Sequence, residues 1–174
     1  MSSKFEAAEA YVRLLPEGDK VIIIMRHQNA LKWLRDLLIS GNAVPFNQLG
    51  YVDGFTTVPE RKRILCSFRT KGSEIRVLLI TKLVGGCGLN LAIANHILNL
   101  DPDWVQDTDY QVECRVNRLG QTKRTFVLRF MVEGTLDVFA MRQQDAALIE
   151  QTSFYRTVFT DKFDKKCDQE LLSH

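Results

Sequence analysis

The residues of this chain best suited to chemistry are two arginines and a glutamine, Arg115, Arg118 and Gln111. At about 100° per residue, they fall within about 60° of one another on a helix. The apolar residues of the same stretch form a separate stripe that suits the core: Val112, Val116 and Leu119. Arginine suits phosphate because its planar, permanent charge donates two parallel hydrogen bonds. A solvated basic helix face is the alternative that this spacing leaves open.

A second candidate lies upstream, where an apolar run predicts a buried strand that leads into a glycine-rich turn. Thr81 and Lys82 follow the strand, and the glycines are Gly85, Gly86 and Gly88. Glycine lets a ligand approach the backbone closely, and successive N–H groups in such a turn can form an anion nest. Parallel sheets place their ligand sites at the carboxyl ends of strands, so this turn is a candidate site. An ordinary strand-to-helix turn is the alternative.

Strand and helix patterns alternate along the chain, which favours a parallel sheet flanked by helices. Apolar runs predict the strands, about five or six in all, at 21–25, 49–52, 77–80, 97–100 and 125–132. Helical spacing of apolar residues predicts the helices, at 3–15, 29–40, 59–68 and from 134 to about 151. These elements would bring the glycine turn and the arginines to the same part of one domain.

Composition limits the classes of protein that fit. The 174 residues are 45% hydrophobic and 25% charged, which suits one domain with a sizeable core. The net charge is only +2, so any contact with nucleic acid must come from a local patch. The four cysteines show no C-x-x-C spacing and are interpreted as reduced thiols of an intracellular protein. We see no signal-peptide pattern and no apolar run long enough to span a bilayer, so no membrane partner is expected.

The strand and helix at 21–40, the glycine turn and the arginine segment resemble motifs IV, V and VI of the superfamily-two helicases. The closing R-L-G-Q-T-K, at 118–123, resembles the SWI/SNF-type branch, which comprises DNA-translocating ATPases. The run from 53 to 68 is similar to the D-G-S-T…E-E-R…F segment of that family. The resemblance covers roughly residues 3 to 150. It implies an α/β fold, a RecA-like (P-loop NTPase-type) parallel sheet with helices on both faces, as a single lobe at 1–152. A C-terminal extension, 153–174, is expected to be partly docked or frayed.

The resemblance also implies roles for individual residues. Arg115 and Arg118 would act as arginine fingers toward ATP bound on a first lobe. Three residues would contact the nucleotide, namely Gly88, Asn90 and Gln111. Five would hold the DNA backbone, namely Thr81, Lys82, Gly85, Gly86 and Arg26. No metal ligands are expected in this chain.

The phosphate-binding and magnesium-binding motifs of such motors are missing from the sequence. Neither G-x-x-x-x-G-K-[ST] nor D-E-x-[HD] occurs in the 174 residues, and the family carries both on its first lobe. The chain is therefore expected to be half of an active site, an excised domain inactive alone. ATP and Mg²⁺ would bind in the two-lobe parent. The expected partners are the first RecA-like lobe, DNA without sequence specificity, and nucleosomes, in the nucleus.

Several positions depart from the family pattern. Met25-Arg26-His27 stands where the family usually has a small polar residue, glutamine and an aromatic. Val105-Gln106 replaces Asn-Pro, Cys114 replaces an acidic residue or glycine, and Asn117 replaces histidine. These departures keep open a degenerate lobe that binds or scaffolds without hydrolysing ATP. A stand-alone nucleotide-binding domain or an RNA helicase lobe is a third hypothesis. The lack of G-x-G-x-x-G counts against the former, and R-L-G-Q counts against the latter.

Overall fold

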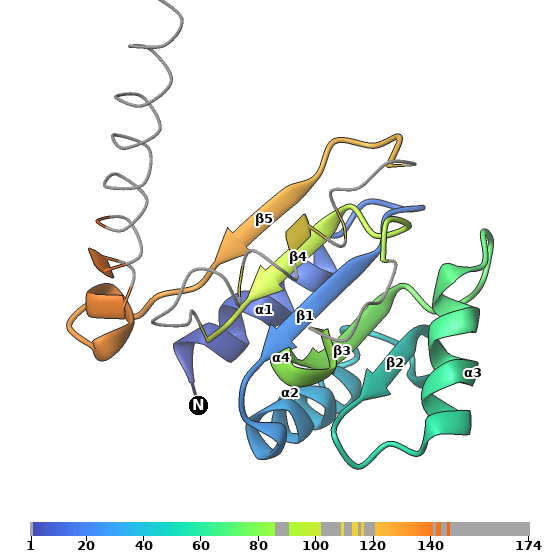
Figure 1. Ribbon diagram of the computed structural model, residues 1–174, viewed down its shortest axis with the longest axis horizontal. Helices are drawn as coiled ribbons and strands as arrows, with labels where there is room; N and C mark the ends of the chain where they lie inside the picture. The colour runs from blue at the N-terminus through green and yellow to red at the C-terminus, as the bar shows by residue number, and fades with distance from the viewer. Residues whose placement is uncertain are drawn as a thin grey trace, which may run out of the picture.

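A five-stranded parallel sheet forms the centre of the protein (Figure 1). The structure is a computed structural model that describes residues 2–85, 91–101, 109, 113, 114, 116, 121–140, 142, 143 and 146. The strands are β1 (Val21–Met25), β2 (Leu49–Val52), β3 (Val77–Thr81), β4 (His96–Asn99) and β5 (Phe126–Arg129). They lie in the order β2-β3-β1-β4-β5, and every pair is parallel. The predicted parallel α/β sheet is therefore confirmed.

The burial of each strand depends on its position in the sheet. All five residues of β1 and of β3 are buried, because these strands lie inside the sheet and are covered on both faces. The edge strand β2 alternates between half-buried and buried residues, and β5 has two exposed and two half-buried residues. The sequence placed β1 and β2 correctly. The strand predicted at 97–100 is β4, which begins one residue earlier, at His96. The strand predicted at 125–132 is β5, which is shorter and spans 126–129.

Helices cover both faces of the sheet (Figure 1). They are α1 (Ser3–Arg13), α2 (Gln28–Ser40), α3 (Val58–Arg69) and the short α4 (Lys82–Gly85), with a 3-10 turn, η1, at Phe46–Gln48. Residues 136–140 are also helical. Helices α1 and α2 pack on one face, while α3, α4 and the segment 91–94 pack on the other. Among the described residues, no helix is long and apolar enough to cross a membrane.

Alternation along β1 divides the core between these two layers. Ile23 contacts the layer made by α1 and α2, whereas Ile22 and Ile24 contact the layer made by α3 and α4. Helix α2 meets the sheet through leucines on one face, which are Leu31, Leu34 and Leu38. Each large aliphatic side chain buried in this way stabilises the fold by about 1.5–3 kcal/mol.

Gly50 in β2 offers a test of how tightly α3 packs on the sheet. A Cβ at this position would lie 3.0 Å from Ile64 Cγ2 and 3.1 Å from Leu78 Cδ1. We expect Gly50→Ala to lower the free energy of unfolding by about 1–3 kcal/mol, because both neighbours are packed side chains. Gly54→Ala is the matched control, since a Cβ there would meet nothing within 4 Å. Urea denaturation measures both variants, and equal stability of the two would contradict this packing.

Candidate functional site

The carboxyl ends of the strands lie along one edge of the sheet, here named the carboxyl edge. The register pairs Met25 with Thr81 and Ile80 with Val52, so β1, β2 and β3 end together. The Arg26 N–H, just after β1, donates to Asp101 Oδ2 at 3.1 Å, which links the end of β1 to the loop after β4. This edge is where a parallel sheet forms its ligand site.

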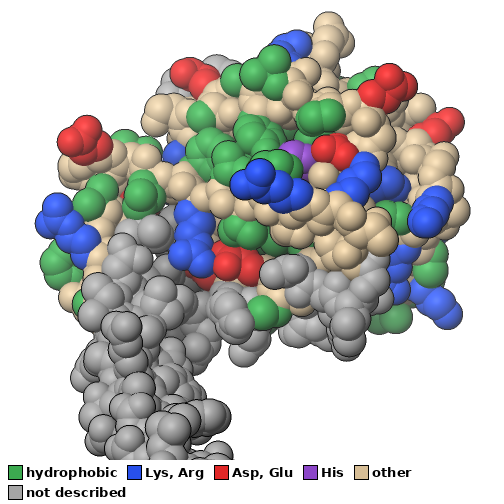
Figure 2. Space-filling model, turned by 90° about the horizontal axis from the view of Figure 1, so that it is seen from above, with side chains coloured by type: hydrophobic (Ala, Val, Ile, Leu, Met, Phe, Trp, Pro, Cys, Tyr) green, Lys and Arg blue, Asp and Glu red, His purple; other side chains and the backbone are tan. Residues whose placement is uncertain are grey.

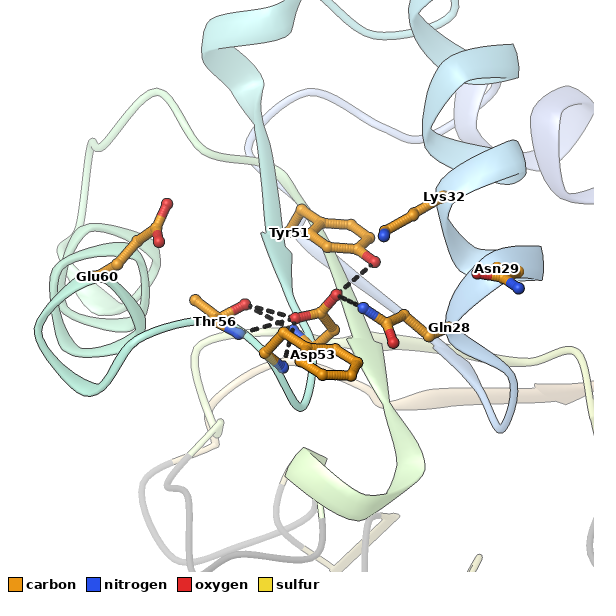
Figure 3. Close-up of a pocket in the computed structure, with 8 residues that line it drawn as sticks. Gln28, Asn29, Lys32, Tyr51, Asp53, Thr56 and Glu60 are labelled. Carbon is orange, nitrogen blue, oxygen red and sulfur yellow. Dashed lines mark hydrogen bonds between the residues drawn. The ribbon is translucent and has the colours of Figure 1, made fainter.

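Asp53, which follows β2, organises the loops at this edge (Figure 3). Its side chain is buried, and Oδ1 accepts hydrogen bonds of 2.9 Å from the Phe55 N–H, the Thr56 N–H and the Thr56 hydroxyl. Oδ2 accepts one from the Tyr51 hydroxyl at 2.9 Å and another from the Gln28 side-chain amide. The carboxylate thereby joins β2, the following turn and the start of α2.

These residues line a cleft of about 550 Å³. Figure 3 shows Tyr51 and Gln28 pointing toward the Asp53 carboxylate, with Lys32 and Glu60 on either side. Phe55 also lines the cleft and is 83% exposed. The Asp53 carboxylate is fully hydrogen-bonded, so its role is to hold the loops. Lys32 is the cation among the lining residues and the group suited to an anionic ligand.

The same contacts set the protonation states. Burial alone would raise the pKa of Asp53, but hydrogen bonds from Tyr51, Thr56 and Phe55 outweigh it and lower the pKa. Burial, together with the hydrogen bond to this carboxylate, raises the pKa of Tyr51. At neutral pH the pair is therefore an ionised carboxylate and a protonated phenol, which suits a fixed structural anion rather than a proton carrier.

Lys82 lies at this edge but not at its surface. Its Nζ is 2.6 Å from Asp109 Oδ1, and the two side chains are only 6% and 1% exposed. Thr81 is also buried. The sequence predicted that Lys82 contacts a DNA backbone, whereas the structure places its ammonium against a buried carboxylate. A buried charge needs such a partner, and residues 27 positions apart gave no sequence signal of the pairing.

Two ion pairs and one core contact attach three residues, Asp109, Glu113 and Val116, to the rest of the lobe. Asp109 pairs with Lys82, which follows β3. Glu113 accepts hydrogen bonds of 2.8 to 3.0 Å from the guanidinium of Arg129, the last residue of β5. Val116 is fully buried in the core layer that contains α3. All three residues are helical, which agrees with the predicted helix here.

The remaining candidate residues divide into two groups. Arg26 is exposed directly after β1, and Gly85 is buried at the end of α4, so both lie at the carboxyl edge together with Thr81. The other six lie outside the described residues, namely Gly86, Gly88, Asn90, Gln111, Arg115 and Arg118. The extension at 153–174 also lies outside them. Within the described part of the chain, no group of three or more His, Cys, Asp or Glu residues could hold a metal ion.

Sequence reasoning missed Gln28, Tyr51 and Lys32 as parts of the cleft. A signal for the Asp53 turn was present, because an aspartate three residues before a threonine is typical of a turn closed by its own side chain. Nothing comparable marked Gln28, which reaches Asp53 from 25 residues away.

A parallel sheet covered by helices on both faces, with polar loops collected at its carboxyl edge, defines a RecA-like α/β lobe. Residues 3–120 match the family described as the helicase conserved C-terminal domain, and the chain belongs to that family. The solved structure of the C-terminal part of the Fun30 ATPase domain agrees in fold. Its TM-score is 0.74 at 22% identity, over 82% of this chain and 45% of that one.

The relatives belong to the SNF2 group, which confirms the resemblance to the SWI/SNF-type branch. Protein CHROMATIN REMODELING 24 of Arabidopsis thaliana is 35% identical over 75% of this chain and 12% of its own length. DNA repair and recombination protein RAD54 of Oryza sativa subsp. japonica is 30% identical over 75% of this chain and 13% of its own. SNF2 domain-containing protein ENL1 of the same rice is 31% identical over 92% and 16%. The chain thus spans less than a fifth of these relatives.

Asp53→Asn tests the loop-holding carboxylate. We expect the free energy of unfolding to fall by about 1–3 kcal/mol at neutral pH. The NH₂ group of asparagine would face N–H and O–H groups that now donate to the carboxylate, and it cannot accept their hydrogen bonds. The pKa of Asp53 is lower in the folded chain than in the unfolded one. Its contribution is therefore fully present above about pH 4 and is lost as pH falls through the folded pKa. Urea denaturation from pH 7 downward should show the difference between variant and parent shrinking in acid. Asp36→Asn, at an exposed carboxylate, is the control, and a pH-independent difference would refute the assignment.

Lys82→Ala separates a structural role from a DNA contact. We expect Lys82→Ala to lower the free energy of unfolding by about 3–5 kcal/mol, because Asp109 would be left as a buried carboxylate without its ammonium partner. Lys82→Met combined with Asp109→Leu should recover most of that stability, since both charges are then replaced by apolar groups. Thermal melting compares the three proteins. A stable Lys82→Ala protein with weakened DNA binding would instead support the contact predicted from the sequence.

Proposed function

We propose that this chain is the second motor lobe of an ATP-dependent translocase of double-stranded DNA, of the chromatin-remodelling or DNA-repair type. The family match from 3 to 120 supports this proposal, because it spans the glycine turn and both arginines. The names of the relatives in chromatin remodelling and DNA repair agree with it. Such a motor would act in the nucleus, with nucleosomes as a further partner.

The observation that carries the proposal is the attachment of Asp109 and Glu113 at the carboxyl edge and of Val116 in the core. Asp109, Glu113 and Val116 lie four and then three residues apart, so they share one helix face, and that face is the attached one. By the same spacing, Gln111, Arg115 and Arg118 would fall about 125–175° from the centre of that face. The helix would then present its phosphate-binding groups away from the sheet, toward a ligand at the edge.

In this proposal ATP and Mg²⁺ bind mainly to the first RecA-like lobe of the same parent. Closure of the second lobe brings Arg115 and Arg118 to the phosphates, and Gly88, Asn90 and Gln111 complete the nucleotide contacts. Phosphoryl transfer needs little covalent chemistry from the protein, so positive charge placed where negative charge develops is the main contribution. The salt bridges of Lys82 with Asp109 and of Arg129 with Glu113 would hold in place the helix that carries the two arginines.

The DNA backbone would run along the same edge, held by Thr81, Gly85, Gly86 and the exposed Arg26. Contacts to phosphates carry no base information, so binding would be independent of sequence. The cleft at Asp53 lies next to this path, and Lys32 adds a cation to it. Lys82 is not part of this proposed surface, because its ammonium is bonded to the buried carboxylate of Asp109.

Substitution of the arginines in the two-lobe parent tests the proposal. Arg118→Ala is expected to lower DNA-stimulated ATP turnover at least about a hundredfold, since arginine fingers elsewhere contribute roughly 10³–10⁵ in rate. Arg115→Ala should also lower turnover steeply. Arg118→Lys should restore little of the turnover, because an ammonium cannot reproduce the planar guanidinium. Arg63→Ala, at an exposed position on α3, is the control and should retain turnover. Thermal melting checks that each variant is folded.

A degenerate lobe that binds or scaffolds is the second candidate. Cys114, an exposed free thiol where the family has an acidic residue or glycine, favours it, as do the substitutions at 105, 106 and 117. A parent that binds DNA without turning over ATP would support this candidate. Near-normal turnover in both arginine variants would exclude the proposed finger role.

A further inference from the structure

The amino ends of the strands carry a second cleft, on the edge of the sheet opposite the candidate site. We name it the amino cleft, and its volume is about 520 Å³. Its lining comes from the turn before β1, the end of α3 with the turn that follows, and the loop before β5. Four of the residues that line it are cationic: Lys20, Arg69, Lys71 and Lys123. No carboxylate is among the lining residues.

Lys20 builds the floor of the amino cleft. Its side chain is buried, and Nζ donates to the Phe68 carbonyl at 2.7 Å, to Ser73 Oγ at 2.9 Å and to the Thr70 carbonyl at 3.4 Å. The ammonium thus binds the last carbonyl groups of α3, where the helix dipole favours a cation. This contact fixes the turn that carries Arg69 and Lys71.

Positive charge remains uncompensated at the mouth of the amino cleft. Arg69 and Lys71 are exposed, and the side chain of neither forms a hydrogen bond or ion pair with any described residue. Lys123 differs, because its Nζ lies 2.5 Å from Asp19 Oδ1 and 2.8 Å from the Gly18 carbonyl. The second oxygen of Asp19 is bonded to His96 Nε2 at 2.9 Å, so this carboxylate does not neutralise the other cations. In the space-filling view, basic side chains gather beside the visible imidazole and an adjacent carboxylate (Figure 2).

We propose that the amino cleft binds the phosphodiester backbone of nucleic acid, as a contact separate from the carboxyl edge. The backbone of the cleft is open to an approaching chain, since a Cβ at Gly18 or Gly72 would meet nothing within 4 Å. The cations also continue along α3, where Lys62 lies on the same helix face as Arg69, two turns away. A row of this kind suits a polymer with regularly repeated charge, and less a single anion or a short acidic motif.

This inference goes beyond the proposed function, which needs only the carboxyl edge, so either can fail while the other stands. The test uses the 174-residue chain with a short fluorescein-labelled DNA duplex at low salt. Arg69→Gln combined with Lys71→Gln should weaken binding at least about tenfold and reduce the slope of log affinity on log salt by about 1.8, for two lost phosphate contacts. Arg35→Gln combined with Arg142→Gln removes the same charge elsewhere and should change binding less than about threefold.

Amide NMR spectra locate the contact. DNA should shift the signals of Gly18, Gly72 and Thr122, and these shifts should disappear in the Arg69 and Lys71 variant while those of Gly54 and Phe55 persist. Thermal melting verifies that the variant is folded, and exposed substitutions should alter stability by about 0.5 kcal/mol or less. Equal loss of binding in the two double variants, or no shifts at the amino cleft, would overturn the proposal. A glutamate decapeptide that produces the same shifts more tightly than DNA would also overturn it, in favour of an acidic protein partner.

Discussion

The burial of β1 and β3 on both faces is the constraint on which the rest of the structure depends. Within these two strands every residue except the last of β3, Thr81, is apolar, so polar groups gather where the strands end. Their parallel arrangement collects all carboxyl ends at one edge and all amino ends at the other. The chain consequently has two polar edges separated by an apolar sheet, and each edge gathers loops that are distant in sequence.

Buried charged side chains at these edges have hydrogen-bond or ion-pair partners among the described residues. Asp53 accepts hydrogen bonds from Tyr51, Gln28 and its own turn, and Asp109 receives the Lys82 ammonium. An unpaired charge in such a place costs several kcal/mol, so each pair strongly favours the arrangement that keeps it intact. The pairs therefore contribute to the uniqueness of the loop conformations, while the stability of the lobe comes mainly from the two apolar layers.

The sequence predicts those features that depend on the local pattern of apolar and polar residues. Residues 21–25 read as a buried strand because every one of them is apolar, and the structure has that strand with those bounds. The strand β4 begins at His96, one residue before the predicted start, because that polar residue is buried by partners far away in sequence. Its ring bonds to Tyr11 of α1 and to Asp19. The inward orientation of Lys82 and the reach of Gln28 to Asp53 depend on similar distant partners, which no local pattern reveals.

Helix α1 ties the two edges into one body. Near its start, the Lys4 ammonium lies 2.7 Å from the Leu100 carbonyl after β4 and 2.7 Å from Asp137. Near its end, the Tyr11 hydroxyl lies 2.7 Å from His96 Nδ1 at the beginning of β4, and the ring of His96 stacks on Phe126 of β5. The Asp19 carboxylate lies on the other side of the same ring, with Oδ2 at 2.9 Å from His96 Nε2. One helix is thus anchored to both ends of the same strand, so the sheet cannot shear between its edges without breaking one of these contacts. This rigidity is what the proposed function would need, because closure at one edge would then act on a polymer bound at either edge.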